Sequence, residues 1–599
     1  MSVIKGFLTV CLLATSLISC ATKEGAEKNI PRKEKVSTAV SAEGFNQVSR
    51  WILACRVGQG GFGCYPGDSA FTTRTGMALE ALQSMGEVGS LSGKKELAEW
   101  LKARQLPDGG FFEADDYYLG KKLPWGSVSA LEPTYWAVHA LAILGEKPSD
   151  PKSCARFITS RKSGNGGYDA YEYAWGGAKE ALYTTFWAVA ALKELGFPVP
   201  DSAKTVEWVR SMQDTHDMRG GFALSNDNFN YSSVSGTCYA VRTLNLLGTE
   251  PKRPREVKKF LLSAYGQEPD GGFEVGHGDN WNNFDHYSRM QDTYGAVYAL
   301  RLLGLPLSDS DSSRASRPMS DCAAWLASVE NPDGGFGRLG RTDQTPLASP
   351  SEMRATWQAV RAFDLLEFPL PQIKNYVQPV SEVKIHQPLH RHPVVDCGDP
   401  CEVWAYRRIA LPIYEYYLAR TGSKIEALGM ISRWVRAAVG PENGAWITGG
   451  RGILMHEWGQ CGAMSWLFQA LATSVDHASR GSFVIGDVNC EILVQEKSWE
   501  TPHWCLFIPF TNEYPDYRLA APDGKRSGWS VLDMVVYYQK RLENLDYPSM
   551  THLGDHLFAQ VRVETVNALN GNWGQEFKMD SLTTYESPVV RELYPEGSW

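Results

Sequence analysis

The chain has 599 residues, of which 43% are hydrophobic, and it carries a formal net charge of −9 at pH 7. This length allows more than one domain, and the hydrophobic content is sufficient for large cores. The negative net charge argues against nucleic acid as a main partner.

Residues 1–20 predict an export signal. Lys5 gives a positive start, and residues 7–18 form an apolar stretch too short to span a bilayer as a mature helix. The stretch ends LISC at Cys20, which resembles the bacterial lipobox, where the cysteine becomes the lipidated first residue. The resemblance implies a lipid-anchored protein of the cell envelope, in the outer membrane of a Gram-negative host. An ordinary signal peptide is the alternative, and residues 21–41 predict a flexible tether.

A Gly-Gly-aromatic turn recurs six times along the next part of the chain. Its closing residues are Phe62, Phe111, Tyr168, Phe222, Phe273 and Phe336. An amphipathic helical segment with an aromatic anchor precedes each turn, and a segment that is apolar on nearly every face follows it. A unit of this kind cannot bury its own apolar face, so neighbouring units must stack. The pattern predicts an all-α (α/α)6 toroid over residues 42–369, with the apolar helices inside.

This pattern resembles the prenyltransferase and squalene-cyclase repeat family, whose fold is an α/α toroid. In protein prenyltransferases of that family, zinc is held by an Asp-x-Cys pair on one inner helix and a His on a later one. Here Cys238 matches, but Gly236 stands in place of the Asp, and Gln291 or Asp292 in place of the His. The DxDD signature of the cyclases is also absent. A catalytic zinc needs about three protein ligands, so we expect no metal and no cofactor, with Cys238 a small core residue.

The loops between the paired helices mix acidic, amide and aromatic side chains, as sites for peptides or polysaccharides do. They are residues 113–120, 169–177, 225–233 and 278–287. Solvated loops that cap one end of the ring are the alternative. Residues 370–401 lack helical periodicity and predict a linker. The linker contains His386, His390 and His392, which could bind a transition metal but have no supporting ligand pattern.

Residues 402–599 predict a second domain. Within it, Cys461 opens an apolar helical segment, where the unpaired N–H groups and the helix dipole favour a thiolate. Residues 482–495 and 504–510 predict two strands. His503 opens the second of them, and Asp523 follows a third short apolar segment.

The order of Cys461, His503 and Asp523 resembles the transglutaminase-like, papain-related superfamily, an α+β fold, and WGQCGAMSWLFQAL is similar to its cysteine helix. The resemblance implies that Cys461 is the nucleophile, His503 the base and Asp523 the group that orients the imidazole. Asp516 is the alternative third member, and His456 a competing base.

The oxyanion of such an enzyme would be held by the backbone N–H of Cys461, helped by Gln460 or Trp458. These residues predict a lipid-anchored thiol enzyme that acts on amide bonds, either as a peptidase or amidase or by transglutaminase-type acyl transfer. The toroid would then serve as its binding scaffold. One alternative is a non-enzymatic binding lipoprotein with an inactive transglutaminase-like fold. The other is a terpenoid-type enzyme in the ring, against which the missing zinc ligands and DxDD motif count.

Overall fold

The computed structural model describes residues 46–58, 60–113, 129–169, 180–213, 220–224, 232–265, 270–274, 288–304, 319–340, 349–373, 375–379, 386–390, 400–439, 453–454, 461–484, 487–497, 502–507, 509, 561–563 and 577–578. The predicted export signal and tether, with Cys20, lie outside these residues. Among the helices described, none is long and apolar enough to cross a membrane.

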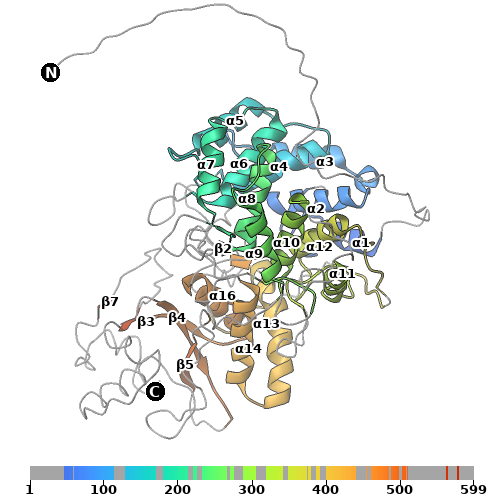
Figure 1. Cartoon of the computed structure of the whole chain (residues 1–599). Coiled ribbons are helices and arrows are strands. Elements are labelled where there is room, and N and C mark those ends of the chain that lie inside the picture. The colour runs from blue at the N-terminus through green and yellow to red at the C-terminus, as the bar shows by residue number, and fades with distance from the viewer. Residues whose placement is uncertain are drawn as a thin grey trace, which may run out of the picture.

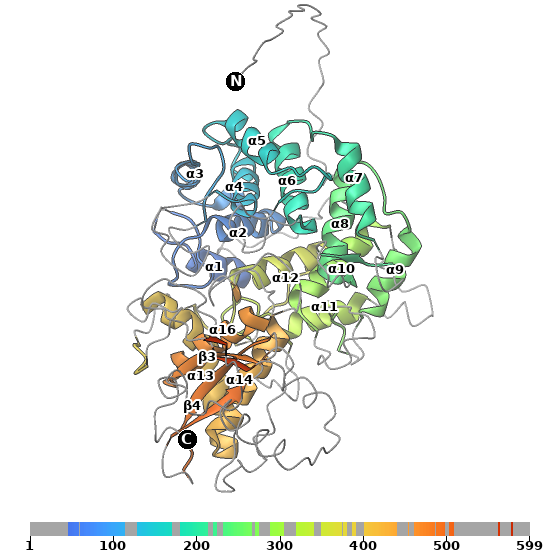
Figure 2. The same cartoon turned by 90° about the vertical axis from the view of Figure 1, so that its left-hand side faces the viewer.

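Two concentric layers of helices form a closed ring (Figures 1 and 2). The outer helices are α1 (Gln47–Ala54), α3 (Lys94–Lys102), α5 (Pro151–Ser160), α7 (Ser202–Ser211), α9 (Pro254–Ser263) and α11 (Met319–Ser328). The inner helices are α2 (Thr72–Ser84), α4 (Leu131–Ile143), α6 (Leu182–Leu195), α8 (Val234–Leu246), α10 (Met290–Leu302) and α12 (Met353–Leu366). Outer helices such as α9 bury one stripe of residues, whereas inner helices such as α4 are buried on nearly every side. The predicted toroid is confirmed.

One hydrogen bond recurs in every unit and ties its turn to its inner helix. The backbone N–H of the turn aromatic donates to a threonine hydroxyl in the first turn of the following inner helix, over 2.9–3.1 Å. The pairs are Phe62–Thr75, Phe111–Thr134, Tyr168–Thr185, Phe222–Thr237, Phe273–Thr293 and Phe336–Thr356. Each bond satisfies a buried backbone donor that the turn would otherwise leave without a partner.

The second glycine of each turn packs against the aromatic anchor of the next outer helix. A Cβ there would lie only 2.4–2.8 Å from ring atoms of the anchor, so no larger residue fits without movement. The pairs are Gly61–Trp100, Gly110–Phe157, Gly167–Trp208, Gly221–Phe260, Gly272–Trp325 and Gly335–Trp51. The last pair joins the sixth turn to the first outer helix, and Trp51 also donates to Asp333 over 3.1 Å. The ring is therefore closed.

The inner layer closes at the same seam, between α12 and α2. Trp357 donates its indole N–H to Glu80 over 2.9 Å, and the Arg361 guanidinium lies 3.0 Å from the same carboxylate. All three side chains are buried. Burying a polar group is costly unless it is paired. These contacts therefore determine that α12 packs against α2 and how closely the two helices approach.

Beside the ring lies a second group of elements (Figure 2). It contains α13 (Pro400–Thr421), α14 (Lys424–Ala438), α16 (Cys461–Ser474) and the strands β3 (Ser479–Val484), β4 (Asp487–Val494), β5 (His503–Phe507), β6 (Val561–Val563) and β7 (Phe577–Lys578). The strands pair in the order β5-β4-β3-β6-β7, and helix α16 packs on the β3–β4 hairpin. A small sheet with helices is what this part of the chain shows, and a transglutaminase-like fold is not established by it.

The prediction of one strand over residues 482–495 is wrong. The segment contains two antiparallel strands, β3 and β4, and Val484 of β3 is the partner of Asp487 in β4. In the sequence, residues 482–495 are interpreted as one strand because Gly486 is the single glycine within them, and one glycine is a weak signal for a turn.

The second group of elements is docked on the ring beside the seam. Arg338, ion-paired with Glu352 over 2.5 Å, also donates to the carbonyl of Leu454. Arg408 on α13 donates to the carbonyl of Ser351 over 2.7 Å and lies 4.3 Å above the ring of Tyr65. The docking face therefore adjoins the N-terminal end of α12, which is one of the ring's inner helices.

The contact between Gly335 and Trp51, which joins the sixth repeat to the first, allows a test of ring closure. Gly335→Ala should lower the free energy of unfolding by about 1–3 kcal/mol, because the new methyl group meets Trp51 and Ser351 at 2.5 Å. Gly167→Ala, at an internal seam, should cost a similar amount. Gly164→Ala is the matched control, since a Cβ there meets nothing within 4 Å. Denaturant unfolding of the three variants measures these costs. An open ring would make Gly335→Ala clearly less costly than Gly167→Ala, because only its contact with Ser351 would remain.

Candidate functional site

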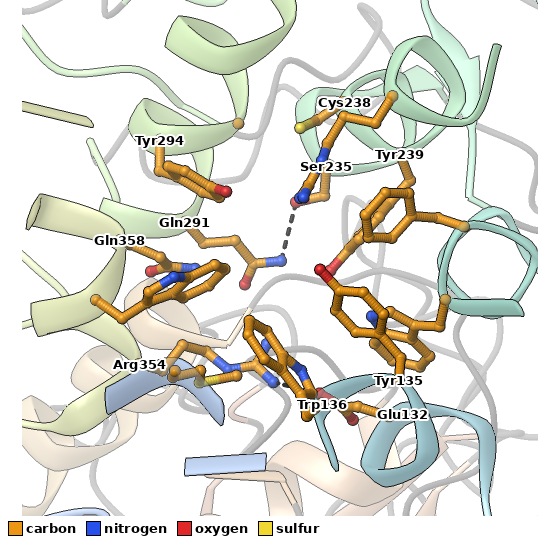
Figure 3. Close-up of a pocket in the computed structure, with 16 residues that line it drawn as sticks. Glu132, Tyr135, Trp136, Ser235, Cys238, Tyr239, Gln291, Tyr294, Arg354 and Gln358 are labelled. Atoms are coloured by element: carbon orange, nitrogen blue, oxygen red, sulfur yellow. Dashed lines mark hydrogen bonds and ion pairs between the residues drawn. The ribbon is translucent and has the colours of Figure 1, made fainter. Parts of the chain in front are cut away.

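A cavity of about 30 Å³ lies at the ring centre, among the first turns of the inner helices (Figure 3). Its lining residues come from all six inner helices. They are Met77, Glu132, Tyr135, Trp136, Phe186, Trp187, Ser235, Cys238, Tyr239, Arg242, Gln291, Tyr294, Gly295, Arg354, Trp357 and Gln358. This volume holds about two water molecules, so a longer ligand requires the lining side chains to move outward.

Aromatic side chains are the largest group among the residues that line the cavity. Trp357 contacts Trp136 and Tyr294, each at a centroid distance of 5.1 Å, and Tyr135 contacts Phe186 at 5.6 Å. Edge-to-face and tilted pairs of this kind hold the rings in fixed orientations. These rings give part of the wall the electron-rich faces that attract unsaturated or positively charged groups.

The second residue of four inner helices brings polar groups to the same cavity. Glu132 on α4 pairs with Arg354 on α12 over 2.9 Å, and both are almost fully buried. Gln291 on α10 donates to the hydroxyl of Ser235 on α8 over 2.9 Å. Arg242, deeper on α8, lies over the rings of Phe186 and Tyr298 at 4.0 and 4.4 Å. The cavity thus combines an aromatic wall with a paired carboxylate and guanidinium.

The residues that would hold a prenyltransferase-type zinc come together but do not suit a metal. Asp292 forms a 2.5 Å ion pair with Arg289, so a guanidinium already occupies its carboxylate. Burial raises the pKa of the Cys238 thiol to about 11. Gly236 offers no side chain. Within the described residues, no cluster of three or more potential ligands occurs.

Sequence reasoning overlooked Glu132, Arg354, Trp136, Tyr294 and Gln358, although a signal was present. Glu132 and Arg354 are charges in the first turn of inner helices, which are buried on nearly every side, and a buried charge must have a partner. The partner could not be named, because the two residues belong to repeats two and six and meet only across the ring.

Cys461 is the first residue of α16, and His503 is the first residue of β5. Gln460, Trp458, His456, Asp523 and Asp516 lie outside the described residues. So do the middle parts of the rim loops, residues 114–128, 170–179, 225–231 and 275–287. In the linker, the His386 imidazole lies 3.3 Å from the carboxylate of Asp476.

Strand pairing does not bring Cys461 and His503 together. His503 pairs with Val494 in β4, and the neighbouring Leu493 accepts a hydrogen bond from His477, three residues after α16 ends. His503 is therefore at the C-terminal end of α16. Cys461 is at the other end, about 20 Å away along a helix of this length.

The sequence model of the prenyltransferase alpha-alpha toroid domain matches residues 10–117, 125–231 and 223–385, together more than half of the chain. The chain belongs to this family. The match and the closed ring agree. No curated protein matches the sequence.

Solved structures show weaker likenesses to this toroid protein. Protein geranylgeranyltransferase-I from Candida albicans, complexed with GGPP, has 16% identity over 49% of this chain and 83% of its own, with a TM-score of 0.36. Type II terpene cyclase MstE from Scytonema has 15% identity over 53% of this chain and 95% of its own, with a TM-score of 0.35. The ent-copalyl diphosphate synthase from Streptomyces platensis has 15% identity over 49% of this chain and 50% of its own, with a TM-score of 0.33. The family assignment rests on the sequence match.

The arrangement of residues around Cys238 can be tested directly by metal analysis. Purified protein should contain no stoichiometric zinc that depends on Cys238, because Arg289 already pairs with the carboxylate of Asp292 and Gly236 offers no side chain. Elemental analysis should give the same metal content for wild type and Cys238→Ser. Cys322→Ser, at another buried cysteine, controls for any general effect of removing a thiol. Loss of one equivalent of zinc from Cys238→Ser alone would overturn this assignment.

Proposed function

We propose that the toroid is an enzyme of isoprenoid chemistry that binds its substrate at the ring centre. The aromatic wall carries this proposal, since Trp136, Tyr294 and Trp357 meet at one cavity together with a carboxylate. Aromatic faces bind unsaturated chains and stabilise developing positive charge. Family membership supports the same substrate class.

Glu132 is the acid–base group of this proposal. It is the one carboxylate among the residues that line the cavity, and Arg354 holds it in place over 2.9 Å. A carboxylate beside an aromatic wall can accept a proton from a cationic intermediate, which ends a cyclisation or an elimination. Zinc-assisted prenyl transfer is not part of the proposal, because the residues around Cys238 do not suit the metal.

Conversion of isoprenoids tests this function. The full chain should convert at least one of squalene, geranylgeraniol and geranylgeranyl diphosphate, with products detected by mass spectrometry. Glu132→Gln should lower the rate by roughly a hundredfold or more, the usual loss on removing an acid–base group, while ligand binding persists. Glu194→Gln on α6, a partly exposed carboxylate that does not line the cavity, should leave the rate unchanged.

Glu132→Gln also leaves Arg354 without its ion-pair partner, so its folding must be checked. Removing one member of a buried pair typically costs about 3–5 kcal/mol. The double variant Glu132→Gln, Arg354→Gln restores neutrality and should recover stability but not turnover. Unchanged turnover in Glu132→Gln, or failure of all three isoprenoids to bind, would contradict the proposed function.

Thiol chemistry at Cys461 is the second proposal, and the position of Cys461 at the start of α16 favours it. The helix dipole stabilises a thiolate there. In this hypothesis the triad with His503 and Asp523 would cleave or transfer amide bonds held by the toroid, as transglutaminase-like enzymes do. The strand register counts against His503 as the base, and so ranks this proposal second.

Alkylation by iodoacetamide as a function of pH tests whether Cys461 is reactive, and whether its reactivity depends on His503. The Cys461 rate should rise with a midpoint below about 8.5, the value of a free thiol, because of its helix-terminal position. His503→Ala should leave that midpoint unchanged, since His503 lies at the far end of α16. Cys461→Ser identifies the labelled site. An upward shift of the midpoint in His503→Ala would instead support the triad.

Lipid anchoring at Cys20 is a further proposal, which rests on the LISC sequence that ends the apolar stretch. Metabolic labelling with a fatty acid in a bacterial host should label the wild type and leave Cys20→Ala unlabelled. Cys11→Ala, inside the same apolar stretch, should label like the wild type. Equal labelling of Cys20→Ala would exclude the anchor.

A further inference from the structure

The inner helices of the described ring contain three glycines, and two of them are required by packing. The three are Gly76 on α2, Gly236 on α8 and Gly295 on α10. A Cβ at Gly76 would lie 2.7 Å from the ring of Trp136, and one at Gly236 would lie 2.7 Å from the carbonyl oxygen of Phe222. A side chain at either position would therefore collide with its neighbour.

A side chain at Gly295, by contrast, would fit. Its Cβ would lie 3.4 Å from the Cβ of Cys238, 3.5 Å from Val234 and 3.9 Å from the Cys238 sulfur, which are ordinary van der Waals distances. Gly295 is inside a regular helix, where alanine is more stable than glycine. Neither the backbone nor the neighbouring atoms therefore explain why this position carries no side chain.

Gly295 and Cys238 both line the ring-centre cavity. They meet at the second turn of α10 and α8, where these two helices face each other. The level of the first turn is closed by the hydrogen bond from Gln291 to α8. The level of the third turn is closed by Arg242, which lies 4.4 Å from the ring centre of Tyr298. Between these two closed levels the wall consists of a cysteine and a glycine.

Other inner helices meet at the same level through aromatic side chains. Tyr135 on α4 contacts Phe186 on α6 at a centroid distance of 5.6 Å, and Tyr294 on α10 contacts Trp357 on α12 at 5.1 Å. Packed rings of this kind can give way only if they change rotamer. The contact between α8 and α10 therefore offers space to a ligand at a lower cost than these aromatic contacts do.

Unpaired polar atoms around the cavity indicate that it holds bound molecules. They are Nε1 of Trp136, the hydroxyl of Tyr294, Oε1 of Gln358 and Nε of Arg354, all buried and without a hydrogen-bond partner in the described part of the chain. Buried polar atoms in proteins are nearly always paired, and all four residues line the cavity. Because the atoms include neutral donors, an acceptor and a charged group, they do not define one head group. The chain of the ligand is the part that the wall between α8 and α10 can select.

We propose that Gly295 reserves space between α8 and α10 for the hydrocarbon chain of the ligand, and that this space limits the length of the chain. The proposal rests on the proposed function and adds a residue that determines its specificity. The cavity of about 30 Å³ is smaller than any prenyl chain, so a longer chain needs more space along the wall. A methyl group at Gly295 would fill that space without straining the ring.

Prenyl ligands of three lengths test this role on the full chain. Geranyl, farnesyl and geranylgeranyl compounds are compared within each head group, as alcohols and as diphosphates, by equilibrium binding. Gly295→Ala should weaken the geranylgeranyl ligand roughly tenfold or more, the usual effect of one methyl group in an apolar pocket, the farnesyl ligand less and the geranyl ligand least. Gly164→Ala adds a methyl group in a turn outside the cavity and should change none of these affinities.

Denaturant unfolding separates a loss of space from a loss of folding. Gly295→Ala should unfold at the same denaturant concentration as the wild type or a higher one, because alanine favours the helix and its Cβ fits. The double variant Gly295→Ala, Cys238→Ala should recover geranylgeranyl affinity, since removal of the Cys238 sulfur returns space beside the new methyl group. Cys322→Ala, at a buried cysteine outside the cavity, is the control and should change no affinity.

The outcomes distinguish this inference from the proposed function. Unchanged geranylgeranyl affinity in Gly295→Ala would overturn the role of Gly295 and leave an isoprenoid-binding ring. An equal loss for all three lengths would also overturn it, because the methyl group would then act on the part that the ligands share. A marked loss of stability in Gly295→Ala would make the glycine a packing requirement and overturn it as well. If no ligand with either head group binds the wild type, the proposed function and this inference are both wrong.

Discussion

The ring depends on the contact between the second glycine of each turn and the aromatic anchor of the next outer helix. Any side chain at that glycine would overlap the anchor, so the two units can approach only where a hydrogen replaces the Cβ. The contact repeats from unit to unit, and Gly335 makes it with Trp51 of the first helix. Closure leaves no exposed apolar end, which an open stack of repeats would need to cap.

Closure also creates the site. It points the first turns of the inner helices toward a single centre, so Glu132 and Arg354 become partners although they belong to repeats two and six. A buried ion pair gains little stability over apolar residues of equal size, because desolvation opposes the Coulomb attraction. In the proposed function, the carboxylate of this pair is the acid–base group at the cavity.

The second group of elements shows how strand count decides the geometry of a site. Successive antiparallel strands start at alternating ends of the helix that precedes them. A single strand over residues 482–495 would have placed His503 beside Cys461. The β3–β4 hairpin adds one strand and moves His503 to the opposite end of α16. The order of Cys461 and His503 along the chain therefore does not fix how the two residues lie in space.

The sequence by itself determined the repeat, the paired helices and the closed toroid, because Gly-Gly-aromatic turns and helical periodicity are local signals read over a few residues. Tertiary structure alone decided which side chains share the ring centre, since Trp136, Tyr294 and Gln358 lie in separate repeats. It also decided that Cys461 and His503 lie apart. Contacts across a closed ring or sheet depend on register and closure, and no local pattern encodes them.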